Sequence, residues 1–154
     1  MPEIEFDEWF KALTGLQESE SPFPWQQKLF EEFVQKRFRS TCDIPTGLGK
    51  TAVIAVWLLA LAHHASHGTH YDFPRRLVYV VNRRTVVDQS TQEAVNMREA
   101  LDREVRLKGV KDALQSLGVL KWDNPLAIST LRGEMADNGE WRDDPARPAI
   151  LSVQ

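Results

Sequence analysis

A segment from Asp43 to Thr51, which reads Asp-Ile-Pro-Thr-Gly-Leu-Gly-Lys-Thr, has the residue types and spacing of a phosphate-binding loop. The general pattern is Gly, four residues, then Gly-Lys-Ser/Thr, and this chain matches its end but has isoleucine at its first position. Gly47 and Gly49 let the backbone curl so that several N–H groups point at an anion. Lys50, where a helix starts, would reach the β- and γ-phosphates, and the Thr51 hydroxyl would complete the shell of Mg²⁺. The segment favours a nucleoside triphosphate site over a plain glycine-rich turn before a helix.

The elements around this loop predict an α/β fold. Residues 39–44 are expected to form the first core strand, and the helix over 50–64 is apolar nearly all round, which is typical of a helix buried against a sheet. The β-branched run over 77–81 predicts a strand that is buried on both faces. Further helices are expected from 85 onward and over 108–117, and further strands over 126–129 and 149–153. Such alternation predicts an open parallel sheet flanked by helices, with ligands beyond the carboxyl ends of its strands.

The remaining segments are expected to be peripheral. An amphipathic helix is predicted over 6–14, ending at Gly15, and a second helix begins at Pro24. The polar stretch over 132–148 is interpreted as a loop. Cys42 is expected to be a buried small side chain. The four histidines at 63, 64, 67 and 70 favour a solvated polar loop over a metal site.

Bulk composition sets the class of protein. The chain has 154 residues, a net charge of −3 and one cysteine, which fits a single domain without an internal disulfide and a cytoplasmic location. Mild acidity excludes a whole-surface binder of nucleic acid, although a local basic stripe remains possible. The longest uncharged apolar run, Ala52 to Ala62, is shorter than the roughly 20 residues that span a bilayer, so no membrane partner is expected.

Three motifs in combination resemble one family. They are Phe23-Pro24-Trp25-Gln26, the loop with its Pro45-Thr46-Gly47 start, and the segment from Val80 to Gln89 that contains Asn82-Arg83-Arg84-Thr85. Together they resemble superfamily 2 helicases, and most closely the N-terminal part of the helicase–nuclease of type I CRISPR interference. Nearly the whole chain is covered by this resemblance.

The resemblance assigns roles residue by residue. ATP would be held by Gln26, which reads adenine, and by Thr46, Gly47, Leu48, Gly49, Lys50 and Thr51. Within this set, Lys50 and Thr51 would act in catalysis, and Thr51 would hold Mg²⁺ through its hydroxyl. The backbone of single-stranded DNA would contact Asn82, Arg83, Arg84 and Thr85. The alternatives from the residues alone are a surface glutamine at 26, and Thr85 as a simple helix cap beside solvated arginines. Ser129 to Glu134 would be a second, weaker DNA-contacting turn, and an ordinary strand-end turn is an equal alternative.

The implied organisation is an N-terminal helical extension over 1–22, then an incomplete first RecA-like motor domain over 23–154. The family's acidic Mg²⁺ motif and second motor domain are not found in the sequence. We therefore expect ATP binding but little hydrolysis or unwinding by this chain alone, as a fragment or partial gene product. Its partners would be single-stranded DNA, an RNA-guided CRISPR surveillance complex and the rest of the helicase.

Two alternatives remain open. One is a non-catalytic module that docks on the surveillance complex through an exposed aromatic start formed by Phe6, Trp9 and Phe10. The other is another superfamily 2 DNA translocase, such as a restriction motor, which the phosphate loop alone does not distinguish.

Overall fold

The computed structural model describes residues 2–44, 49–120, 122–132, 135–136 and 139–154. Its sheet has the order β1-β4-β2-β3, with β1 over Arg76–Val80, β4 over Ala149–Val153, β2 over Ala127–Arg132 and β3 over Met135–Ala136. β1, β4 and β2 are parallel, whereas the short β3 pairs antiparallel with β2. The expected α/β fold with a parallel sheet flanked by helices is confirmed, and it is consistent with part of a RecA-like domain.

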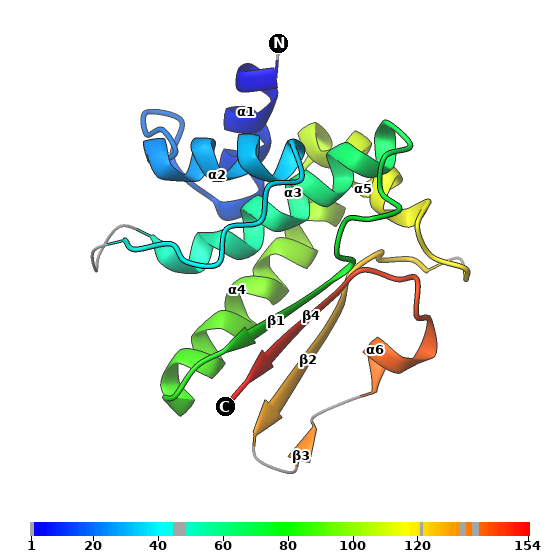
Figure 1. Ribbon diagram of the computed structural model, residues 1–154. Helices are drawn as coiled ribbons and strands as arrows, with labels where there is room; N and C mark the ends of the chain where they lie inside the picture. Colours follow the sequence, from blue (N-terminus) through cyan, green and yellow to red (C-terminus); the bar gives the residue numbers. More distant parts are fainter. Residues whose placement is uncertain (1, 45–48, 121, 133–134, 137–138) are drawn as a thin grey trace.

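The helices α1 to α5 gather on one side of the sheet, and the short α6 lies on the other side, beside β2 (Figure 1). Alternation along the strands explains the two layers. Ile128 and Ile150 join the main core under the helices, whereas Leu151 belongs to a small second cluster with Trp141 of α6. The helical elements are α1 Pro2–Thr14, α2 Pro24–Val34, η1 Lys50–Ala52, α3 Val53–Ser66, α4 Arg84–Arg103, η2 Val105–Leu107, α5 Lys108–Gln115 and α6 Glu140–Asp143.

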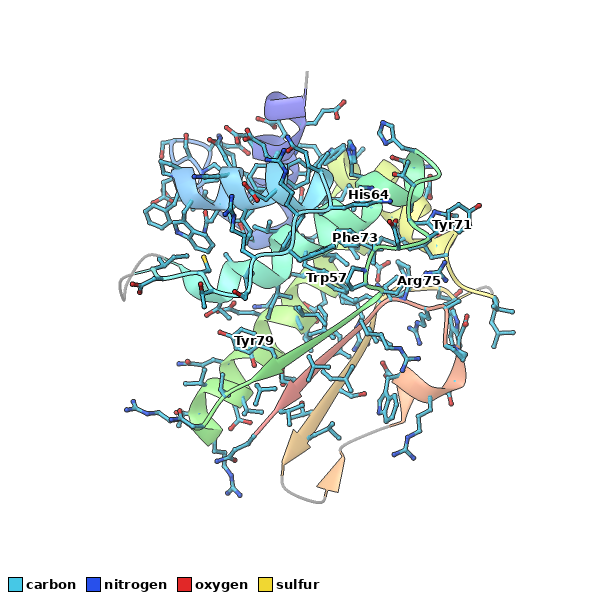
Figure 2. The ribbon with its side chains drawn as sticks, viewed as in Figure 1. Trp57, His64, Tyr71, Phe73, Arg75 and Tyr79 are labelled. Atoms are coloured by element: carbon cyan, nitrogen blue, oxygen red, sulfur yellow. The ribbon has the colours of Figure 1, made fainter. Side chains whose placement is uncertain are left out.

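α3 is the centre of the helical layer. It is buried along most of its length, as its sequence predicts, but its cover comes chiefly from α2, α5 and α1 rather than from the sheet. A helix that is apolar on every side needs apolar neighbours on every side, and helices supply them here. The segment between α3 and β1 folds back over it (Figure 2): the Trp57 indole donates to Pro74 O at 2.9 Å, and Phe73 lies 4.8 Å from the His64 ring.

The expected strand over 39–44 is wrong. Residues 39–44 adopt no regular structure, and Cys42, expected to be buried, is exposed. A strand exists through hydrogen bonds to a neighbour, and in the described part of the chain these ladders join only β1, β4, β2 and β3. A short segment that contains Thr41 and Ile44 therefore does not suffice to make a strand.

β1 is not buried on both faces as its sequence suggested. Val78 is 55% exposed and Val80 is 70% exposed, whereas Leu77 and Tyr79 pack against the main core. The reason is position: β1 lies at one end of the sheet order, and α6 covers the other face only over β2 and β4.

The aromatic residues of α1 face inward. The helix predicted over 6–14 is confirmed, and Gly15 ends it with a φ of 75°. Phe6 and Phe10 are 2% and 3% exposed, and Phe6 stacks on Phe30 of α2 at 4.5 Å. The hypothesis of a docking surface made of Phe6, Trp9 and Phe10 is therefore wrong, because an amphipathic helix buries this stripe against α2, α3 and α4. The boundary at residue 22 stays a prediction.

The segment over 132–148 is more ordered than the loop we expected. It contains β3 and α6, and buried Asp144 accepts hydrogen bonds from the Leu120 backbone N–H at 3.0 Å and the Trp122 indole at 3.1 Å. Composition missed this because a buried carboxylate can organise a polar segment by accepting several N–H groups.

Candidate nucleotide site

Gln26 lies at the junction between α2 and the phosphate loop. Pro24 begins α2 and places Gln26 in its first turn, where the side-chain Oε1 accepts the Phe23 backbone N–H at 2.8 Å. The Gln26 Nε2 donates to Gly49 O, at the end of the phosphate loop, at 3.3 Å. The side chain is only 3% exposed, so the alternative of a free surface glutamine is wrong.

Hydrogen bonds to described residues use half of the hydrogen-bonding capacity of the Gln26 amide. A primary amide has two N–H donors and two oxygen lone pairs, and the contacts to Phe23 and Gly49 use one of each. The remaining donor and acceptor are the pair that adenine matches through N7 and its N6 amino group. The protein thus orients the amide without a ligand, and this would lower the entropy cost of binding a base there.

Glycine suits position 49 in this contact. Its φ is 70°, a region that residues with a Cβ rarely adopt, and an added Cβ would lie 3.1 Å from the Gln26 Nε2 and 3.5 Å from the Phe23 ring. The residue at 49 therefore serves both the loop and the approach of α2. Thr51 follows in η1 and is half-buried.

The other loop residues differ in what the structure describes. The backbone of Lys50 begins η1, and Thr46, Gly47 and Leu48 lie outside the described residues. The predicted roles of these four residues stay predictions.

A cleft of about 760 Å³ opens beside the junction between α2 and the loop. Its volume is in the range of small-molecule sites, about 300–1,000 Å³. The cleft is lined by the end of α1, the α1–α2 connection, the start of α2, the loop end and the middle of α4; the lining includes Phe23, Gln26, Gly49, Thr51, Glu93 and Asn96. Three residues that the sequence assigned to ATP, Gln26, Gly49 and Thr51, therefore share one cavity.

Glu93 and Asn96 on α4 are additions to this site that the sequence analysis did not find. Burial raises the pKa of the half-buried Glu93 carboxyl above its ordinary value. One signal was available: Glu93 precedes buried Ala94 and lies one turn before buried Met97, so it borders the apolar face of α4. The sequence does not show which other element packs beside this edge of α4, because that depends on tertiary packing.

The predicted DNA-contacting residues lie elsewhere, between the end of β1 and the first turn of α4. Asn82, Arg83, Arg84 and Thr85 are all exposed, and in the described part of the chain none of their side chains has a hydrogen bond or ion pair. Arg83 occupies the N-cap position of α4 without a side-chain cap, so the alternative of Thr85 as the cap is wrong. Exposed arginines beside a helix N-terminus are suited to phosphate oxygens.

Two hydroxyl pairs fix α4 against the sheet behind this turn. Ser90 Oγ donates to Ser152 Oγ of β4 at 2.9 Å, and Thr91 Oγ1 lies 2.8 Å from Thr130 Oγ1 of β2. Ser129 and Thr130 are buried inside β2, so these two residues do not form an exposed second DNA-contacting turn. Their hydroxyl chemistry serves packing here, while Gly133 and Glu134 lie outside the described residues.

The histidine group gives no candidate metal centre. Among the described residues no set of three His, Cys, Asp or Glu side chains has the geometry to hold a metal ion. The expected solvated loop is only partly right, because His64 is 2% exposed and hydrogen-bonds to Thr69 Oγ1 at 2.8 Å and Phe33 O at 3.0 Å.

The family model described as "Type III restriction enzyme, res subunit" matches residues 19–124. No curated protein and no solved structure matches the chain. No helix in the described residues has both the length and the apolar character needed to cross a bilayer. The matched segment covers more than half of the chain and contains the phosphate loop, so the chain belongs to this family and carries a helicase superfamily 1/2-type ATPase domain.

Proposed function

We propose that this family member binds ATP with Mg²⁺ and serves as the nucleotide-gripping part of an ATP-dependent DNA helicase or translocase. The observation that carries the proposal is the bond between Gln26 and Gly49, which links a base-reading amide to the end of a phosphate loop at the wall of one cleft. Adenine would lie against the Gln26 donor and acceptor that no described residue uses, and Lys50 and the loop N–H groups would hold the phosphates.

Mg²⁺ would contact the Thr51 hydroxyl at the loop end and keep several of its waters. Bound there, it would neutralise part of the triphosphate charge. Thr51 lines the cleft from η1, just before α3, which fits this role. Little hydrolysis by this chain alone is part of the proposal.

DNA would be held by its backbone at the turn of Asn82, Arg83, Arg84 and Thr85. Support for this comes from the exposure of these four side chains at the carboxyl end of a parallel strand, where α/β proteins bind their ligands. Contacts of this kind hold phosphates without reading sequence.

The setting that the three sequence motifs support is CRISPR interference, with a surveillance complex and the rest of a helicase chain as partners. A second setting is a restriction motor, and one observation favours it: the family description names a restriction enzyme subunit. A binding assay with an RNA-guided complex on opened target DNA separates the two settings, because a restriction motor is not expected to bind such a complex.

The central test is calorimetric titration of the purified chain with Mg·ATP. We expect saturable binding at a single site that is lost in Lys50→Ala, while circular dichroism and the melting temperature stay unchanged. The matched control is Lys28→Ala, which removes an exposed lysine from α2. Absence of binding by the unmodified, folded chain would refute the proposal, as would unchanged affinity in Lys50→Ala.

A further inference from the structure

Glu93 is a half-buried carboxylate that lines the nucleotide cleft without a hydrogen bond or ion pair to any described residue. Two other carboxylates with limited exposure, in or next to α6, do have partners. Asp144 accepts three hydrogen bonds, and Glu140 pairs with Arg98 at 3.1 Å. A carboxylate that loses water contact without gaining a partner costs free energy in the empty protein. Its burial raises the pKa of Glu93, which is consistent with that cost.

Position within the cleft limits what Glu93 can bind. With ATP bound as proposed, Gln26 and Phe23 at the start of α2 would face the base, and Thr51 at the loop end would face the phosphates. Glu93 comes from α4, which supplies a wall separate from both. A carboxylate repels phosphate oxygens, so its partner in a bound nucleotide must be a hydrogen-bond donor.

The part of ATP between base and phosphates is a ribose with two vicinal hydroxyls. Carboxylates bind such hydroxyls in dinucleotide-binding proteins, where one acidic side chain accepts from the sugar. We infer that Glu93 accepts hydrogen bonds from the ribose hydroxyls of the bound nucleotide and makes the site selective for ribonucleotides over deoxyribonucleotides. This inference rests on the proposed ATP binding and adds a selectivity that the phosphate loop and Gln26 do not provide.

The neighbouring Asn96 has a supporting position. Its Oδ1 accepts from Gln92 Nε2 at 3.0 Å, which orients the side-chain amide at the cleft and leaves its N–H groups as donors. An N–H donor beside Glu93 can donate a hydrogen bond to a ribose hydroxyl oxygen while the carboxylate accepts a hydrogen bond from the same hydroxyl.

The experiment is titration of the full chain with Mg·ATP, 2′-deoxy-ATP and 3′-deoxy-ATP. The variants are Glu93→Gln, Glu93→Asp and the control Glu99→Gln, which changes an exposed carboxylate on the same helix. We expect the unmodified chain to favour ATP over at least one deoxy form by about tenfold, the scale of a hydrogen bond to a charged group. Glu93→Gln should reduce this preference to about twofold or less, Glu93→Asp should keep part of it, and Glu99→Gln should keep it fully. A melting curve for each variant confirms folding.

The outcomes distinguish a failure of ATP binding from a failure of the ribose contact. If the unmodified chain binds no ATP, the proposed function fails and the ribose contact fails with it. If it binds ATP and both deoxy forms equally, or if Glu93→Gln keeps the full preference, only the ribose contact is overturned. An equal loss of affinity for all three nucleotides in Glu93→Gln also overturns it, because such a loss does not involve the sugar hydroxyls.

Discussion

The cleft beside Gln26 and the turn after β1 use polar groups in opposite ways. In the cleft, the Gln26 amide is 3% exposed and is held by Phe23 and Gly49 before a ligand binds. In the turn, Arg83 and Arg84 are exposed, and their side chains make no hydrogen bond or ion pair with a described residue. In the proposed functions, the cleft would select its ligand by fixed geometry, whereas the turn would attract phosphates by charge. Substitutions in the cleft should change both stability and binding, and substitutions in the turn should change binding alone.

The largest effect is expected from removing the charge of the turn. Arg83→Ala with Arg84→Ala should weaken binding of single-stranded DNA by roughly tenfold to a hundredfold, and lower the slope of log affinity against log salt by about 1.4, since each phosphate contact releases counterions. ATP affinity and the melting temperature should not change. Fluorescence anisotropy at several salt concentrations measures the slope.

The control for this pair removes the same charge elsewhere. Lys28 and Arg37 are both exposed and lie on or just after α2. If Lys28→Ala with Arg37→Ala weakens DNA binding as much as the arginine pair does, net charge and not the turn holds the DNA, and the contrast between the two regions disappears.

In the cleft, Gln26→Ala should have a double effect. It leaves the Phe23 N–H without its partner and removes the tie to Gly49, which should lower the free energy of unfolding by about 1–2 kcal/mol. It should also weaken ATP binding by about tenfold and reduce the preference for ATP over GTP, because adenine loses its donor–acceptor pair. Chemical denaturation and nucleotide titration give the two values.

The matched control is Gln27→Ala, which removes the next amide along α2. The Gln27 side chain donates to Asp7 Oδ1 of α1 at 2.7 Å and does not line the cleft. It should cost some stability and leave nucleotide preference intact. Loss of the ATP preference in Gln27→Ala alone would show that the wrong amide was assigned to the base.

Sequence patterns predicted the parts of this fold whose burial follows from local periodicity. Val87, Ala94, Met97 and Leu101 recur at helical spacing, and α4 buries all four. Gln26 was predicted to read adenine because a motif places it ahead of the phosphate loop, and the structure shows its amide at the loop end. In each case, the information lies within a few turns of chain or in a fixed spacing.

Contacts between distant segments decided what the sequence did not predict. Residues 39–44 have strand-forming residues, but pairing depends on a neighbour that the segment itself does not specify. Val78 and Val80 looked buried, yet their exposure depends on where α6 lies. Glu93 became part of a candidate site only because tertiary packing places α4 and the end of the phosphate loop on the walls of one cleft. Contacts between segments that are distant in the sequence do not follow from the periodicity of either segment.

The smallest expected effect concerns pH dependence, and it would sharpen the contrast between the cleft and the turn. Of these two regions, only the cleft contains a carboxylate whose burial costs free energy. The folded pKa of Glu93 is raised, so the folded state binds its proton more tightly than the unfolded state, where the pKa is near about 4.3. Proton binding by Glu93 therefore favours the folded state at low pH, and this contribution to the free energy of unfolding is lost as the pH rises through the folded pKa. The unmodified protein and Glu93→Gln should thus have similar free energies of unfolding at about pH 4. At about pH 7 the variant should be slightly more stable than the unmodified protein. Glu99→Gln, at an exposed position, should show no such trend in denaturation at both pH values. A constant difference between unmodified protein and Glu93→Gln would mean that the empty cleft keeps its carboxylate solvated, like the side chains of the turn.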